Sequence, residues 1–195
     1  MSLARENNVL APEGDLPSLK IPKKNPTTAE PQTDQHIDNV AHVLIAEIPK
    51  SGNRWNQVNF RLDDYKNYFG VRGDTEKLVV FRHVNGDGTL DNYERNRPPV
   101  TVKSRNFRFE LAAAAGIAYP SLDNGRPIGI YVRVATRTFF YRLLLPDDIE
   151  YSTVRNILTD FAGEPSKNMR SIRLRVEELR TRWPRSPFWK LPESR

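Results

Sequence analysis

The sequence contains no cysteine in its 195 residues. This absence excludes disulfide frameworks, thiolate zinc sites and cysteine nucleophiles. Long apolar runs are also missing, since none approaches the ~18 residues that a membrane-spanning helix requires. No apolar signal segment precedes Arg5, the first charged residue. We therefore expect a cytoplasmic protein with no membrane partner.

Enzyme motifs are missing as well. The chain has no G-x-S-x-G elbow, no phosphate-binding Gly-Lys-Ser/Thr loop and no G-x-G-x-x-G. Its three histidines, His36, His42 and His83, do not have the spacing of metal ligands. The acidic residue and later Glu-x-Lys triplet that a metal-dependent nuclease uses are not found either. The sequence therefore predicts no catalytic residue, no metal site and no cofactor in this chain.

Positive charge is in modest excess and unevenly placed. The chain holds 30 Lys and Arg against 24 Asp and Glu, a formal net charge of +6. Residues 163–195 carry nine basic and four acidic residues, whereas residues 37–162 carry 17 and 15. The basicity is thus mostly a property of the C-terminal segment, and bulk charge does not make the middle of the chain a nucleic-acid binder.

Composition divides the chain into three segments. Residues 1–36 contain five prolines and no apolar period, which predicts a disordered or extended Pro-rich arm. Residues 37–162 read as one folded domain. Residues 163–195 are expected to form a basic C-terminal helical tail.

The middle segment has the pattern of a β protein. Strands are predicted over 41–48, 58–62, 77–84, 100–103, 128–134 and 139–145. The alternation of 100–103 continues through 107–111. A helical turn is expected at 63–69, ended by Gly70, and a loop at 85–99. This spacing indicates a mainly β (α+β) fold, an antiparallel pseudobarrel of about seven strands with short helices.

Two helices are predicted near the C-terminus. The first begins at Pro146-Asp147-Asp148, ends at Gly163 and shows an apolar face. That face comprises Ile149, Val154, Ile157, Leu158 and Phe161. The second covers 171–183, and its apolar residues at helical spacing form one stripe. The stripe comprises Ile172, Val176, Leu179 and Trp183.

Two polar stretches interrupt good strands with side chains that can read DNA. The first stretch covers 50–57, where arginine can pair with guanine, and Asn or Gln with adenine. Its Lys and Ser can hold phosphates, and Trp55 can stack on a base. Its candidate contact residues are Lys50, Ser51, Asn53, Arg54, Trp55, Asn56 and Gln57. The alternative is a solvated hairpin whose Trp55 folds back onto the core.

The second polar stretch covers 103–108 and is a basic cluster around an asparagine. Its candidate contact residues are Lys103, Ser104, Arg105, Asn106 and Arg108. The alternative is an edge strand whose charges prevent unwanted pairing.

The order of these pieces resembles the DNA-recognition pseudobarrel shared by plant B-three transcription factors and some restriction endonucleases, of the BfiI C-terminal and EcoRII N-terminal type. The resemblance covers about residues 38–147. It rests chiefly on Asp64-Tyr65, Phe69, Asn106-Phe107, Phe109, Leu111, Ile128 and Arg133-Val134. The small apolar run 112–116 departs from the pattern, and reads either as a close backbone approach to DNA or as a short helical insertion.

The resemblance implies sequence-specific binding of double-stranded DNA by two arms that grip the major groove, here 50–57 and the stretch beginning at Lys103. It further implies a recognition module of a restriction-modification or related defence system, with cleavage supplied by a fused or partner nuclease. Two other functions remain open. One is a protein-interaction module in which the C-terminal stripe, with Phe188 and Trp189, docks on a partner or a second copy. The other is a small-barrel RNA or modified-base reader using Trp55, Tyr119 and Tyr131.

Overall fold

A computed structural model describes residues 37, 41–50, 54–72, 77–96 and 107–191. All of them belong to one compact unit, which spans residues 33–195. The arm predicted over 1–36 lies outside the described residues. In the described part of the chain, no helix has the length and apolarity needed to cross a membrane.

The described residues of the unit form eight strands, which supply most of their regular structure. They are β1 (His42–Glu47), β2 (Gln57–Asn59), β3 (Val79–Val84), β4 (Leu90–Asn96), β5 (Arg108–Glu110), β6 (Ile128–Ala135), β7 (Thr138–Leu144) and β8 (Ser171–Arg175). The helical elements are the π-helical turn η1 (Asp64–Tyr68), the 3₁₀ turns η2 (Ala112–Ala114), η3 (Leu122–Asn124) and η4 (Pro187–Lys190), and the α-helices α1 (Tyr151–Ala162) and α2 (Val176–Arg182).

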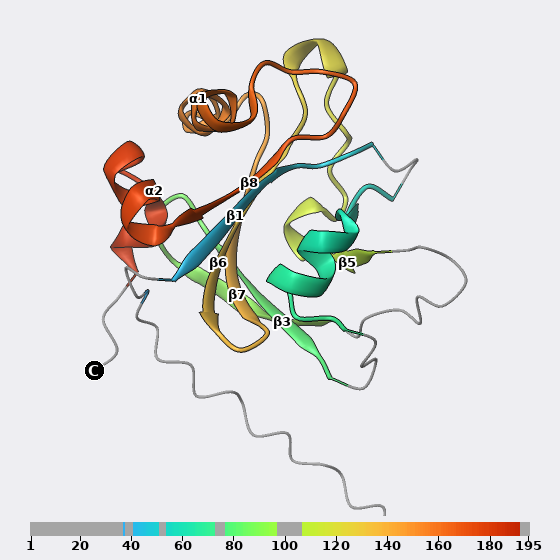
Figure 1. The fold of residues 1–195 in the computed structure, drawn as a ribbon, viewed down its shortest axis with the longest axis vertical. Helices are drawn as coiled ribbons and strands as arrows, with labels where there is room; N and C mark the ends of the chain where they lie inside the picture. Colours follow the sequence, from blue (N-terminus) through green and yellow to red (C-terminus); the bar gives the residue numbers. More distant parts are fainter. Residues whose placement is uncertain (1–36, 38–40, 51–53, 73–76, 97–106, 192–195) are drawn as a thin grey trace, which may run out of the picture. The chain divides into compact units, whose positions relative to one another are not determined.

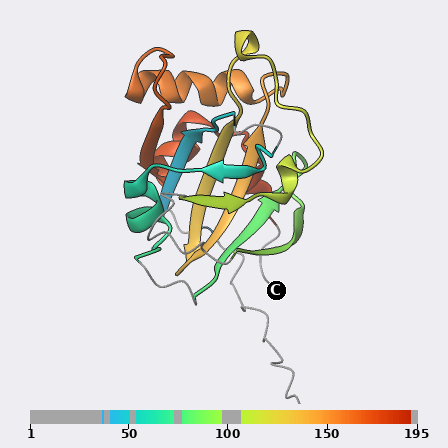
Figure 2. The ribbon, with the colours of Figure 1, turned by 90° about the vertical axis from the view of Figure 1, so that its right-hand side faces the viewer.

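Six strands form one mixed sheet in the order β4-β3-β7-β6-β1-β8. All neighbours in it are antiparallel except β3 and β7, which are parallel. The remaining strands, β2 and β5, pair with each other as a short antiparallel ribbon. Figure 2 shows this ribbon in front of the large sheet, and Figure 1 shows α1 and α2 on the other side.

Both faces of the large sheet are buried, which explains why its central strands are almost continuously apolar. In β1, Leu44 points into a core shared with the ribbon, and its neighbours Val43 and Ile45 point into a second core beneath the helices. The first core is rich in aromatic rings. It includes Phe60, which contacts Phe69 with ring centroids 4.7 Å apart. The ribbon therefore rests on a rigid aromatic layer.

The mainly β fold class predicted from the sequence is confirmed, with β3–β7 as the parallel exception to the expected antiparallel pairing. The region 85–99, predicted as a loop, contains β4, an edge strand whose residues are mostly polar and solvated. Such a strand shows little apolar alternation, so its pairing with β3 was not visible in the sequence. The run 112–116 contains the short helical insertion η2.

Two helix predictions need correction. Residues 171–175, predicted as the first part of a helix, form β8, which pairs with β1, and only 176–182 are helical. The first helix begins at Tyr151 rather than at Pro146–Asp148, so Ile149 lies outside it and is 95% exposed. Phe161, placed on the apolar face, is 44% exposed, whereas Tyr151 is buried. Gly163 ends α1 as predicted, with a positive φ of 78°.

Candidate nucleic-acid interface

The β2–β5 ribbon has one apolar and one polar face. Side chains alternate between the two faces of a strand, so the buried Val58 and Phe109 turn toward the core and their neighbours turn outward. The outward residues form two directly opposed pairs. These pairs are Gln57 with Glu110, and Asn59 with Arg108. We call this polar surface the ribbon face.

The ribbon face leaves most of its polar atoms available for a ligand. Gln57 Nε2 donates a hydrogen bond of 2.7 Å to Glu110 Oε1, which orients both side chains across the ribbon. Asn59 and Arg108 have no side-chain partner among the residues that the structure describes, although Arg108 is half-buried. A half-buried arginine without a carboxylate partner keeps its five donors for a ligand.

The core side of the ribbon is held by stacked aromatic rings. Tyr65, from η1, stacks on Phe109 with ring centroids 5.0 Å apart, and Phe109 also contacts Phe69 at 5.1 Å. Burial raises the pKa of the Tyr65 hydroxyl to about 12, so it stays protonated at neutral pH. The ribbon face is therefore displayed on a support that does not have to reorganise when a ligand binds.

The first polar stretch is anchored at its C-terminal end. The side chains of Lys50 and Arg54 are exposed, with no partner in the described part of the chain. Trp55 is 3% exposed, and its Nε1 donates to the Ile117 carbonyl at 2.6 Å. The stacking role expected for Trp55 does not fit this burial, which agrees with the alternative in which the ring folds back onto the core. The Asn56 carbonyl accepts a hydrogen bond from the Leu111 amide at 2.9 Å.

The roots of the second polar stretch are fixed as well. Asn96, at the end of β4, brackets the backbone of Glu110: its Nδ2 donates to the carbonyl and its Oδ1 accepts from the amide. The Phe107 carbonyl accepts from the Phe60 amide at 2.7 Å. The predicted residues Lys103, Ser104, Arg105 and Asn106 lie outside the described residues, as do Ser51 and Asn53.

The structure thus brings one residue from each predicted stretch, Gln57 and Arg108, onto the same surface, at diagonal positions of the ribbon. It adds Asn59 and Glu110, which sequence reasoning did not select. The alternation of polar and apolar residues through 57–59 and 108–110 was visible, but the pairing of these two strands was not. Asn59 becomes a candidate only because it lies opposite Arg108.

The residues of the two alternative functions are placed differently. Of the three aromatic residues considered for base reading, Tyr131 is fully buried, and Trp55 packs edge-on against Tyr119 at 5.5 Å, so they line no open pocket together. The C-terminal stripe lies against the chain's own sheet. Val176, Leu179, Trp183 and Phe188 are all buried in the second core.

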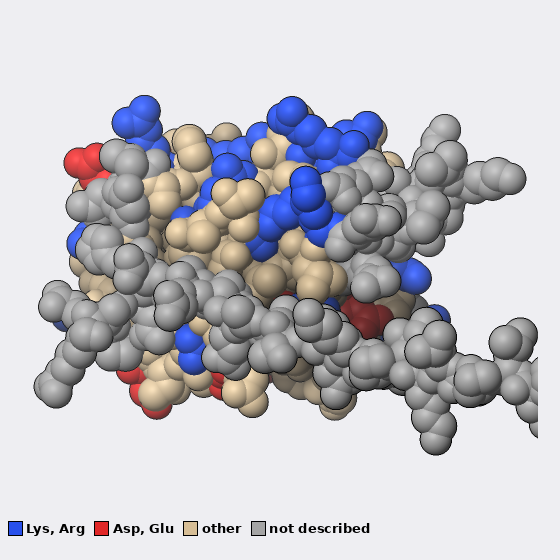
Figure 3. Space-filling model, turned by 90° about the horizontal axis from the view of Figure 1, so that it is seen from below, with Lys and Arg blue, Asp and Glu red and all other residues tan. Residues whose placement is uncertain are grey.

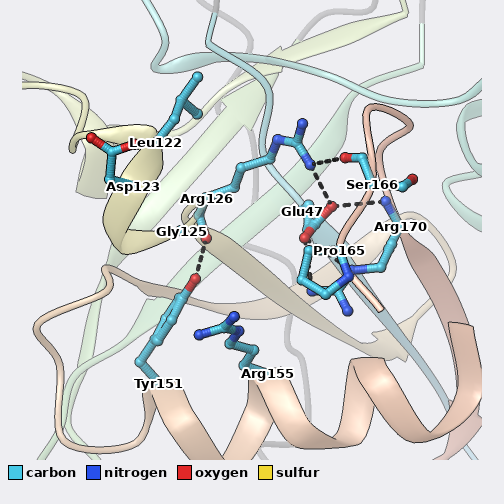
Figure 4. Close-up of a pocket in the computed structure, with 10 residues that line it drawn as sticks. All are labelled: Glu47, Leu122, Asp123, Gly125, Arg126, Tyr151, Arg155, Pro165, Ser166 and Arg170. Carbon is cyan, nitrogen blue, oxygen red and sulfur yellow. Dashed lines mark hydrogen bonds and ion pairs between the residues drawn. The ribbon is translucent and has the colours of Figure 1, made fainter. Parts of the chain in front are cut away.

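A separate hollow of about 230 Å³ lies between α1, the 122–126 turn and the segment 165–170 (Figure 4). Its most buried charge is Glu47, whose carboxylate contacts Arg126 at 3.3 Å and Arg170 at 2.9 Å. Burial raises the pKa of the nearby Tyr151 hydroxyl, which donates to the Arg126 carbonyl. Both oxygens of Glu47 already accept hydrogen bonds, so this carboxylate is committed to its two arginine partners.

Comparison with solved structures gives a distant likeness. No protein-family model matches the sequence, and no curated protein matches it. The solved N-terminal domain of Helicobacter pylori LlaJI.R1 superposes with a TM-score of 0.46 and 7% sequence identity, over 68% of this chain and 97% of that one. So low a score does not establish a shared fold.

Proposed function

We propose that this chain binds double-stranded DNA in a sequence-specific manner and that the ribbon face enters the major groove. The observation that carries the proposal is the composition of that face: arginine, asparagine, glutamine and glutamate project side by side from a rigid two-stranded ribbon. The major groove is wide enough to admit a two-stranded ribbon.

The chemistry of the four side chains suits base edges. Arginine pairs with the O6 and N7 atoms of guanine, asparagine with N6 and N7 of adenine, and glutamate accepts from N4 of cytosine. The two opposed pairs are two residues apart, about 7 Å along a strand. This separation is close to the rise of two base-pair steps of ~3.4 Å each. Arg108 and Asn59 therefore address one position, and Gln57 and Glu110 a second one nearby.

The two polar stretches complete the contact in this proposal. Lys50 is exposed and would hold the DNA backbone. Arg54 is exposed at the Gln57 end of the ribbon, where its carbonyl accepts from the Gln57 amide, and its side chain would read a base edge. The residues expected to contact DNA in the second stretch, from Lys103 to Asn106, belong to the same proposal. So does the wider role inferred from the resemblance: a recognition module of a restriction-modification or related defence system whose nuclease is a fused or partner domain.

The test is selection of bound sequences from a random duplex library, followed by affinity measurements on the selected site and on unrelated DNA. Arg108→Ala and Asn59→Ala should each cost about 1–3 kcal/mol on the selected site and relax its preference at one base pair. Arg155→Ala is the matched control, because Arg155 is an exposed arginine of α1, on the other face of the large sheet. Equal losses on selected and unrelated DNA for Arg108→Ala, or no selected motif at all, would contradict the proposal.

A further inference from the structure

The turn η1 carries a concentration of positive charge on its exposed side. Lys66 is exposed on η1, and Arg72 is exposed shortly after it in the chain. Arg133 and Arg173 reach η1 from β6 and β8, and Arg137 reaches Gly70, just after η1, from the β6–β7 turn. The β6–β7 turn lies at the lower end of the sheet in Figure 1. Figure 3 shows that lysine and arginine predominate over aspartate and glutamate on the described part of the face seen from that side. We call these five residues the η1 cluster.

Internal contacts hold three of the five cations in place. Arg133 donates to the Tyr68 carbonyl and lies over the Tyr68 ring at 5.0 Å. Arg137 donates to the carbonyls of Gly70 and Lys77 at 2.6 and 3.0 Å. Because carbonyl partners carry no net charge, both guanidinium groups keep their full positive charge on the surface.

Carboxylates offset only part of this charge. Arg173 pairs with Asp64 at 2.6 Å and with Asp63 at 2.5 Å. The hydrogen bond from Asn67 and the charge of Arg173 lower the pKa of Asp63, so it is ionised at neutral pH. Lys66 has no partner in the described part of the chain, and Arg72 makes only a long contact of 3.5 Å to Asn67 Oδ1. These two cations are the least engaged of the cluster.

The η1 cluster adjoins the ribbon face at its Arg108 end. Tyr65 of η1 contacts Phe107, the residue before Arg108, with ring centroids 5.6 Å apart. Lys66 follows Tyr65 directly. The basic residues of α2 and η4 are placed differently, because these two elements pack on the opposite face of the large sheet from the ribbon. Some are also engaged there, since Arg182 pairs with Asp160 at 2.9 Å.

We infer that the η1 cluster, through Lys66 and Arg72, holds the phosphate backbone of the duplex whose bases the ribbon face reads. This inference rests on the proposed function and adds a sequence-independent contact to it. It also assigns the electrostatic attraction to η1 rather than to the more basic C-terminal segment. Phosphate contacts position a protein on the duplex without reading its sequence, so the cluster sets affinity and register but not preference.

The test measures the salt dependence of binding to a short duplex of random sequence, by fluorescence anisotropy over a series of NaCl concentrations. Each lost phosphate contact lowers the slope of log K against log salt by about 0.9. Lys66→Ala with Arg72→Ala should therefore reduce the slope by about 2, and should weaken binding to selected and random duplexes equally. Arg185→Ala with Lys190→Ala is the matched control, which removes two exposed cations on the α2 side and should leave the slope unchanged.

The outcomes separate this inference from the proposed function. An unchanged slope in the Lys66/Arg72 variant, with wild-type binding intact, would overturn the inference and leave the ribbon proposal standing. An equal fall in slope for the Arg185/Lys190 control would overturn it too, because the attraction would then be diffuse. Wild-type protein that binds no duplex would overturn both. Far-UV circular dichroism and thermal unfolding verify that each variant is folded.

Discussion

Arg170 donates two hydrogen bonds to a single oxygen of Glu47, from Nε at 3.0 Å and from Nη2 at 2.9 Å, and both side chains are about 95% buried. The backbone amide of Arg170 donates to the other carboxylate oxygen at 3.0 Å. The pair joins the last residue of β1 to the residue before β8. Glu47 also stands just before the segment that leads to Lys50, so this buried ion pair fixes the root of the first polar stretch.

Replacing Glu47 with glutamine should destabilise the fold strongly. The amide keeps the shape of the side chain but removes the negative charge that compensates Arg170 and Arg126. Leaving a buried charge unpaired costs about 3–5 kcal/mol of unfolding free energy. Urea denaturation measures the loss. Asp160→Asn is the control, because its pair with Arg182 is exposed and contributes about 0–1 kcal/mol. Equal small losses in the two variants would contradict this prediction.

Leu179→Ala should show that the C-terminal stripe belongs to the chain's own core. Leu179 is fully buried, so the truncation should cost about 2–5 kcal/mol through lost burial and a cavity. Ile149→Ala removes a similar number of carbon atoms from a side chain that is 95% exposed, and should stay within about 0.5 kcal/mol. Thermal unfolding compares the two variants. A neutral Leu179→Ala would mean that the stripe is available to a partner.

Trp55→Phe should affect stability rather than DNA recognition. The variant keeps an aromatic ring but removes the donor to the Ile117 carbonyl. The net loss of one hydrogen bond is about 0.5–1.5 kcal/mol, and the smaller ring leaves a cavity at this buried position that adds to the loss. Chemical denaturation should show this loss, while the affinity of the folded variant for a selected duplex should match that of the wild type. A weakened affinity at unchanged stability would restore the stacking role expected from the sequence.

His83 should make the protein less stable in mild acid. Burial lowers its pKa below the ordinary value of 6.5, an effect that outweighs the hydrogen bond to Asp91, which raises it. The unfolded chain therefore binds a proton more readily than the folded one. The stability present above pH 6.5 is lost as the pH falls below that value.

His83→Gln isolates this contribution from that of the carboxylates. Between neutral pH and mild acid, the wild type should lose more unfolding free energy than the variant, as measured by urea denaturation at each pH. Parallel curves for the two proteins would show that the pKa of His83 is the same in the folded and unfolded chains.

The sequence by itself determined the strand-rich fold class and the position of most strands. The apolar runs at 41–48, 128–134 and 139–145 could be read because burial on both faces leaves them almost no polar residue. The turn before Gly70 and the end of α1 at Gly163 could be read because both glycines adopt a positive φ, which other residues disfavour. These are local effects, which act over a few neighbouring residues.

Only the tertiary structure decided which polar residues share a surface. Residues 108–110 pair with 57–59, and 171–175 with β1, and each pairing joins segments that are far apart in the sequence. Residues 171–175 form a strand rather than the predicted helix, because the edge of the sheet at β1 was available for pairing. The first pairing placed Asn59 opposite Arg108. Contacts with Ile117 and Tyr119, more than 60 residues away in the sequence, place Trp55 in the core. Local sequence patterns do not reveal such contacts, because the energy that a strand gains on pairing depends on the residues of its partner strand.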